Sequence, residues 1–189
     1  KTSKINLLIE SQYRKLFDLG DLILESAFLP YSGNNSIKGF LKIKGNARLD
    51  QSAFLNVDTT LISDTSFLGK YGYDDRDRFL NSISFEKFSN RSSLRASTLY
   101  HTSLRDSNTV EPLVLPDLRY RKYRKLKKSG LLLSEKYSLV GISRQEGTGY
   151  SRLSADLELS KSWQTENGLI VRGTGNILTA AYSENNINT

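Results

Sequence analysis

The clearest pattern along the chain is a strict alternation of apolar and polar residues over segments of ten or more residues. In "SRLSADLELSKSW", residues 151–163, Leu153, Ala155, Leu157 and Leu159 alternate with charged and hydroxyl side chains. Successive side chains of a β-strand point to opposite faces, so this segment would form a strand with one apolar and one polar face. A helix would scatter the same residues around its circumference.

The same period of two recurs along the chain and predicts an all-β protein. Clusters typical of turns, such as "SGNN", "FSNRSS", "RQEGTG" and "TENG", separate the alternating segments. We expect nine antiparallel strands in up-and-down order, near residues 20–29, 37–47, 53–63, 78–87, 93–102, 113–122, 131–142, 151–163 and 168–182. Residues 1–19 are then an uncertain lead-in segment, 20–182 the strands and loops of the barrel, and 183–189 a loop or truncated end.

The lengths of strands and connections favour a membrane barrel. Soluble strands mostly have about 5–6 residues, whereas a tilted strand needs about 9–11 to cross a bilayer. The connections at 30–36, 64–77, 103–112 and 143–150 fall at one end of the strands, and those at 48–52, 88–92, 123–130 and 164–167 at the other. The first set is longer on the whole, and 123–130 is the exception. Outer-membrane barrels have short periplasmic turns and long external loops. We therefore predict an antiparallel up-and-down transmembrane β-barrel, of which these strands are the N-terminal part.

Alternation alone does not say which face meets lipid, because a soluble lipocalin-like barrel has the same period with its apolar face inside. Charged residues share one face of the expected strands, namely Lys38, Lys42, Lys44, Arg95, Arg152, Asp156 and Glu158. Inside a small closed barrel nearly every charge would need a partner, whereas a wide lumen hydrates them. Lys161 and Trp163 end the apolar face of their strand, as residues at a membrane interface do.

The composition favours certain classes of binding partner but does not identify a single one. The 189 residues carry a formal net charge of +7, which favours nucleic acid, anionic lipid or lipopolysaccharide as partners, unless the surface is simply basic. No run of eighteen apolar residues predicts a transmembrane helix, and the first ten residues lack the apolar core of a signal peptide. The absence of cysteine excludes disulfides within these residues, and the absence of methionine is typical of a processed chain or a fragment. We expect no metal site and no cofactor.

One pair of residues is a candidate for catalysis. His101 is the only histidine, and Ser103 lies two residues further on the same face of a strand. This spacing resembles the His-x-Ser pair of outer-membrane phospholipase A and of lipid A deacylases, in which histidine is the base for serine. Those enzymes display the pair toward lipid. Here both residues lie at odd-numbered positions of the strand, like Arg95, so they share its parity and should face the lumen. A polar lumen-facing pair is the favoured interpretation, and a small lipid hydrolase is the alternative.

The run "RYRKYRKLKK", residues 119–128, interleaves tyrosines with basic residues. Such a surface would suit a soluble basic β-domain that binds nucleic acid. The run begins in an alternating segment and ends in a connection, so a solvated turn or a phosphate-attracting rim is the favoured interpretation.

Three segments together resemble a known family. "SDTSFLGKYGYDDRDRF" at 63–79 has a serine-acidic stretch followed by Phe-Leu and Tyr, "EPLVLPDLRY" at 111–120 has Val-Leu-Pro, and 139–163 has Arg, Gly and Arg before a strand ending in Trp. In order and spacing they resemble the lipopolysaccharide-assembly family LptD, or organic solvent tolerance protein, of the alphaproteobacterial type. The matching residues are Asp64, Phe67, Leu68, Tyr71, Val114, Leu115, Pro116, Arg144, Gly147, Arg152 and Trp163.

The resemblance implies transport without catalysis. Such proteins form a very large barrel, plugged by the lipoprotein LptE, in the outer membrane of Gram-negative bacteria. They receive lipopolysaccharide from an LptA-like periplasmic bridge and release it into the outer leaflet between the first and last strands. Nucleic acid is not an expected partner. Basic lumen-facing residues would attract the phosphates and sugar acids of lipopolysaccharide, namely Lys38, Lys42, Lys44, Arg95, Arg119 and Arg121.

The chain also departs from the family pattern. Nine strands are too few for the family's barrel, no periplasmic jelly-roll is recognisable before residue 20, and the interdomain disulfides cannot form without cysteine. We therefore expect a piece of the barrel domain.

Overall fold

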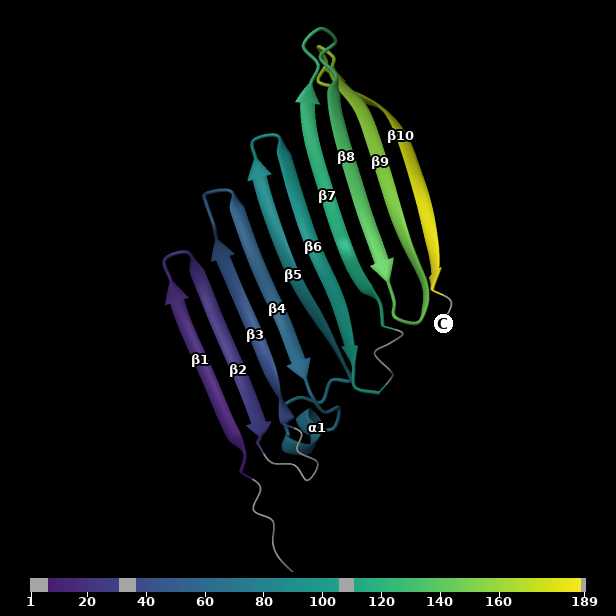
Figure 1. The fold of residues 1–189 in the computed structure, drawn as a ribbon. Helices are drawn as coiled ribbons and strands as arrows, with labels where there is room; N and C mark the ends of the chain where they lie inside the picture. The colour runs from purple at the N-terminus through teal and green to yellow at the C-terminus, as the bar shows by residue number, and fades with distance from the viewer. Residues whose placement is uncertain (1–6, 31–36, 106–110, 188–189) are drawn as a thin grey trace, which may run out of the picture.

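The computed structural model describes residues 7–30, 37–105 and 111–187. They form a ten-stranded sheet in which each strand pairs antiparallel with its neighbours in chain order (Figure 1). The strands are β1 (Ile9–Phe17), β2 (Gly20–Leu29), β3 (Lys38–Arg48), β4 (Ala53–Ile62), β5 (Arg78–Ser89), β6 (Ser92–Ser103), β7 (Leu113–Lys125), β8 (Leu132–Ser143), β9 (Gly147–Gln164) and β10 (Ile170–Ile187). A short helix, α1 (Phe67–Tyr71), lies between β4 and β5. The predicted all-β, antiparallel, up-and-down fold is confirmed.

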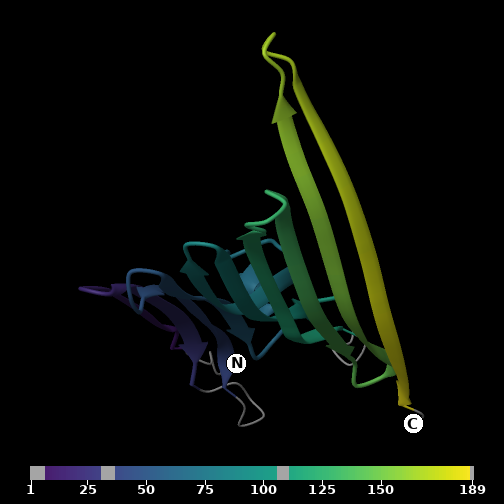
Figure 2. The same cartoon turned by 90° about the horizontal axis from the view of Figure 1, so that it is seen from above.

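The sheet is strongly curved and open, with β1 at one edge and β10 at the other (Figure 2). Adjacent strands twist relative to one another, so a sheet of this many strands curls. Most strands have ten or more residues, and β9 and β10 have 18 each. An open, curved sheet of long meandering strands is consistent with part of a barrel wall.

The connections divide by length between the two ends of the strands only in part, because the three longest lie at one end together with the short turn 144–146, which was expected to be a longer connection. At one end the strands are joined by residues 30–37, 63–77, 104–112 and 144–146, and at the other by 18–19, 49–52, 90–91, 126–131 and 165–169. Helix α1 lies at the end with the long connections (Figure 1). In the ranges that the structure describes, no helix is long and apolar enough to span a membrane.

The structure adds one strand that the pattern did not predict, and it lengthens several others, β9 most, which runs from Gly147 to Gln164 instead of 151–163. Strand β1 falls in the expected lead-in segment, and β10 runs past residue 182 to Ile187. Every residue of β1 is exposed. An edge strand that buries little needs no clean apolar face, and "IESQYRKLF" carries charges at positions of both parities, so period-two analysis misses it.

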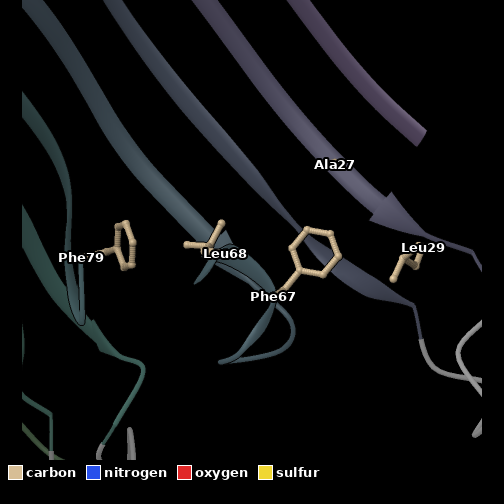
Figure 3. Packing of buried hydrophobic residues seen from close by; sticks show 5 residues of the cluster. All are labelled: Ala27, Leu29, Phe67, Leu68 and Phe79. Carbon is tan, nitrogen blue, oxygen red and sulfur yellow. The ribbon is translucent and has the colours of Figure 1, made fainter. Parts of the chain in front are cut away.

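A small apolar core lies where α1 folds back against the sheet. Phe67 and Leu68 of α1 are each 2% exposed and pack with Ala27, Leu29 and Phe79 (Figure 3). The rings of Phe67 and Tyr73 stack with their centroids 6.0 Å apart. Helix α1 ends at Gly72, whose φ of 72° is the left-handed conformation typical of a helix C-terminus. The connection predicted at 64–77 is therefore a folded element that packs against the sheet.

Candidate functional site: the polar face of the sheet

The hydrogen-bonding register assigns strand residues to two faces, because cross-strand partners in an antiparallel pair project to the same side. The polar face is defined by four series of successive partners: Gln12, Glu25, Lys42 and Thr60; Arg14, Ile23, Lys44, Asp58 and Ser82; Glu86, Arg95, Arg119, Ser138 and Ser154; and Ser93, Arg121, Lys136 and Asp156. We call the opposite side the apolar face. Charges predicted from parity to share one side of the sheet do so.

The apolar face is exposed over its whole width. Its large side chains include Leu41, Leu61, Ile83, Leu94, Leu118, Leu153, Leu159, Val171 and Ile177, each more than a third exposed. A continuous exposed apolar surface marks a contact with a membrane or another protein. Near the short turn after β9, Lys161 Nζ lies 5.6 Å from the ring centroid of Trp163. This pair follows the apolar run of β9, where interface residues are expected in a membrane strand.

The three lysines predicted on β3 each lie against a carboxylate. Lys38 Nζ is 2.5 Å from Asp64 Oδ2, Lys42 Nζ is 3.6 Å from Glu25 Oε2, and Lys44 Nζ is 3.4 Å from Asp58 Oδ2. Opposite charges on adjacent strands stabilise the pairing of those strands. The β3 part of the polar face is therefore close to charge balance.

The three predicted arginines lie on β6 and β7 and are arranged differently. Arg95 is 3.5 Å from Glu86, and Arg119 makes two hydrogen bonds of 2.9 and 3.1 Å to Asp117. Arg95 and Arg119 are direct cross-strand partners. In the described part of the chain, no carboxylate lies within ion-pair distance of Arg121. The six predicted cations thus separate into a paired group on β3 and a crowded group on β6 and β7.

A hollow of about 600 Å³ opens over the crowded group. Besides the three arginines, it is lined by Lys136 of β8 and Arg152 of β9. Its carboxylates are Glu86 and Asp156, the latter 2.9 Å from Lys136 Nζ. Lys136 was not among the predicted binding residues, although its parity in β8, between Ser134 and Ser138, already placed it on the polar face. We name this feature the β6–β9 hollow.

The loop between β4 and β5, residues 63–77, is tied to the sheet through Asp64. Its Oδ1 accepts hydrogen bonds from Ser66 N at 3.0 Å and Ser66 Oγ at 2.6 Å, while Oδ2 takes the bond from Lys38. The Lys38 ammonium, and after it the Ser66 hydroxyl, lower the pKa of Asp64 to about 2. Donors that favour the charged carboxylate have this effect.

A second tie joins the same loop to β1. The Tyr73 hydroxyl donates a hydrogen bond to the Glu10 carboxylate. Burial, and after it this bond, raise the pKa of the Tyr73 hydroxyl to about 12. The matching residues Asp64, Phe67, Leu68 and Tyr71 thus belong to one structural unit, the anchored loop and its core.

The Val114-Leu115-Pro116 motif forms an irregularity in β7. The register to β6 and to β8 shifts between Val114 and Asp117, so one extra stretch of backbone bulges out of the ladder. Gly141 of β8 faces this bulge, and a Cβ there would lie 2.7 Å from Leu115 O. Bulges bend a strand and increase its local twist, and this one needs glycine on the neighbouring strand.

The remaining matching residues lie along β9 and in the turn before it. Arg144 Nη1 donates to Thr148 O at 2.7 Å across the turn from β8, and Gly147 in that turn has a φ of 107°. Arg152 lines the hollow with its guanidinium 5.5 Å from the Tyr182 ring centroid. Trp163 covers Gly173 of β10, where a Cβ would lie 3.2 Å from the indole.

The candidate catalytic pair lies on β6. His101 is the cross-strand partner of Leu80, and Ser103 that of Arg78. Ser103 is 1% exposed, and its Oγ accepts a hydrogen bond from Arg105 N at 3.2 Å. The nucleophile required by a hydrolase is therefore packed inside the protein in this structure.

The comparisons with known proteins agree with this arrangement. The model of the family "LptD: LPS transport system D" matches residues 36–188, most of the chain. The search of curated proteins finds no match. The match begins just before β3 and runs through β10, so it includes the β3 lysines, the anchored loop and the β6–β9 hollow. The chain therefore belongs to the LptD family of outer-membrane proteins, which act in lipopolysaccharide transport and assembly.

Proposed function

We propose that this chain forms part of the barrel of a lipopolysaccharide translocon that inserts lipopolysaccharide into the outer leaflet of the outer membrane. The polar face lines a hydrated lumen, and the apolar face contacts lipid. The observation that carries the proposal is the division of one continuous sheet into a side of ion pairs and a side of exposed leucine, isoleucine and valine. Transmembrane barrels of outer-membrane type alternate in this way.

The chemistry of the polar face suits an anionic glycolipid. Sugars need hydrogen-bond donors and acceptors along their path, and phosphates or sugar acids are attracted by arginine and lysine. Acyl chains would be kept off this face, because burying them against charged groups costs the hydration of those groups. Movement along such a surface requires no covalent step, so the proposed role is transport without catalysis.

The partners follow from the same role. A barrel large enough to pass a glycolipid needs a plug, for which we propose the lipoprotein LptE. It also needs a donor on the periplasmic side, for which we propose an LptA-like bridge. We also propose that the chain is of the alphaproteobacterial type of the family.

The test is to extract the full-length protein from outer membranes in detergent and identify what co-purifies. We expect a stable complex with a small lipoprotein, carrying lipopolysaccharide. Depletion of the protein in cells should reduce lipopolysaccharide at the surface, measured by labelling intact cells. A barrel that purifies alone, with unchanged surface lipopolysaccharide after depletion, would contradict the proposal.

A further inference from the structure

The β6–β9 hollow carries more positive than negative charge. Five cations and two carboxylates line it, and Asp117, 3% exposed behind Arg119, supplies a third carboxylate. Arg95, Arg119 and Lys136 each lie against one of these carboxylates, as the β3 lysines do against theirs. In the described part of the chain Arg121 and Arg152 have no carboxylate within ion-pair distance. The surplus positive charge of the polar face is therefore concentrated in one place.

Like charges in the hollow are direct neighbours. Arg95 is the cross-strand partner of Arg119, and Arg121 is the cross-strand partner of Lys136. Like charges directly opposite one another destabilise a strand pair. An anion seated between β6 and β8 would turn this repulsion into attraction, because each cation would gain a partner of opposite sign.

Arg152 has one buried donor, its Nε, without an acceptor in the part of the chain that the structure describes. Its guanidinium rests over Tyr182, which holds the group in place beside the hollow. A buried unsatisfied donor is costly, so a ligand that accepts a hydrogen bond from Arg152 would offset that cost.

We propose that the β6–β9 hollow is a discrete subsite for a doubly anionic part of a saccharide, either a phosphate monoester or a pair of neighbouring uronic-acid carboxylates. Arg121, Lys136 and Arg152 are its principal contacts, and Arg95 and Arg119 complete it. The proposal rests on the lipopolysaccharide-transport function proposed above. It assigns a binding site for the sugar part of the glycolipid during transport. The β3 lysines are not part of that site. A volume of about 600 Å³ lies within the range of pockets that enclose small ligands.

The experiment places a photoreactive benzoylphenylalanine at Ser93, which lines the hollow beside Arg121, in the full-length protein in living cells. A second probe at Ser84, on the polar face outside the hollow, reports on the rest of the lumen. We expect irradiation to give a lipopolysaccharide adduct from Ser93, detected by immunoblotting. Removing the charges of Arg121 and Arg152, with R121Q and R152Q, should lower that adduct about tenfold, since charge-assisted hydrogen bonds are lost.

Three variants make the result specific. R172Q removes a polar-face arginine of β10 that lies 3.6 Å from Glu158, outside the hollow, and should leave the adduct unchanged. R121K with R152K keeps both charges and should retain most of it. R121Q alone, at an exposed position, should give an intermediate loss and serves if the double variant does not fold. Folding is checked by the mobility of the unheated barrel in a detergent gel.

The outcomes separate this proposal from the function on which it rests. Lipopolysaccharide adducts from Ser84 but none from Ser93, or a Ser93 adduct unchanged by the arginine-to-glutamine variants, would overturn the subsite and leave the transport role standing. A Ser93 adduct with a protein would also overturn it and assign the hollow to an acidic peptide. Failure of the transport role itself would appear as normal surface lipopolysaccharide after depletion.

Discussion

Lys38 Nζ lies 2.5 Å from Asp64 Oδ2, so a basic residue of the polar face is committed to anchoring a loop. The same carboxylate accepts two hydrogen bonds from Ser66 at the start of α1. One acidic side chain therefore connects β3 to the helix that covers the apolar core. This connection makes the loop between β4 and β5 sensitive to substitution and to pH.

We predict that D64N loosens α1. The half-exposed ion pair stabilises the loop by about 0.5–1 kcal/mol, so trypsin should cut after Lys70, within α1, about two- to fivefold faster at pH 7 in the full-length protein. D75N, at an exposed neighbouring position, is the control and should not change the rate.

The lowered pKa of Asp64 also determines how acid changes the stability of the loop between β4 and β5. The folded loop holds the ionised form, with its pKa at about 2 against an ordinary 3.8. Its contribution to stability is therefore complete above pH 3.8 and disappears as the pH falls through 2. Pepsin cleavage within the loop, corrected for the activity of pepsin on an unfolded substrate, should rise across that interval. The D64N variant should show a smaller rise, because Asp74, whose pKa is lowered by its hydrogen bond from Arg76, still titrates in the same loop.

For Tyr73 we expect the opposite pH dependence, a loss of stability at high pH. Its folded pKa of about 12 exceeds the ordinary 10, so its stabilising contribution is complete below pH 10 and is lost as the pH rises through 12. The tyrosinate absorbance of the wild type, minus that of Y73F, should titrate with a midpoint near 12. A midpoint at the ordinary value would mean that neither the burial of Tyr73 nor its hydrogen bond to Glu10 is kept in solution.

Periodicity predicted most of the fold because the sheet has two chemically different faces. Leu153 to Leu159 on one side of β9, against Arg152, Asp156 and Glu158 on the other, define a strand without any knowledge of its neighbours. Strand β1 escaped detection because it is exposed throughout. The five-residue α1 escaped because it is stabilised by packing against residues of β2 and β5 that are distant in sequence.

The candidate site was predictable only in part for a related reason. Parity gives the face of Lys44 or Arg121, but the register between strands decides whether a carboxylate lies opposite. Lys44 meets Asp58, whereas Arg121 meets Lys136. This difference separates a balanced region from an anion-attracting one, and it depends on pairings between strands that the alternation within one strand does not specify.

The bulge in β7 can be tested through Gly141. A Cβ at this position would lie 2.7 Å from the backbone oxygen of Leu115 and 3.1 Å from the Pro116 ring. Because backbone must move to make room, we expect G141A to destabilise the barrel by about 1–3 kcal/mol, as overpacking does. The midpoint of urea unfolding of the full-length protein in detergent measures it. Gly175 has no atom within 4 Å of its added Cβ, so G175A is the control and should unfold near the wild-type midpoint.

The orientation of the sheet can be tested on β10 with two neighbouring residues. Ile177 is 69% exposed on the apolar face, opposite Leu157, and Asn176 lies on the polar face, opposite Glu158. If the apolar face meets lipid, I177R places a charge in the bilayer and should cost about 2–4 kcal/mol near the midplane. N176R places the same charge in a hydrated lumen beside a carboxylate and should cost little. The folded fraction after insertion into lipid vesicles, read from the mobility of the unheated protein, compares the two. A larger loss for N176R would mean that the polar face is turned to the membrane, and equal folding of both variants would mean that the apolar face does not meet hydrocarbon at this position.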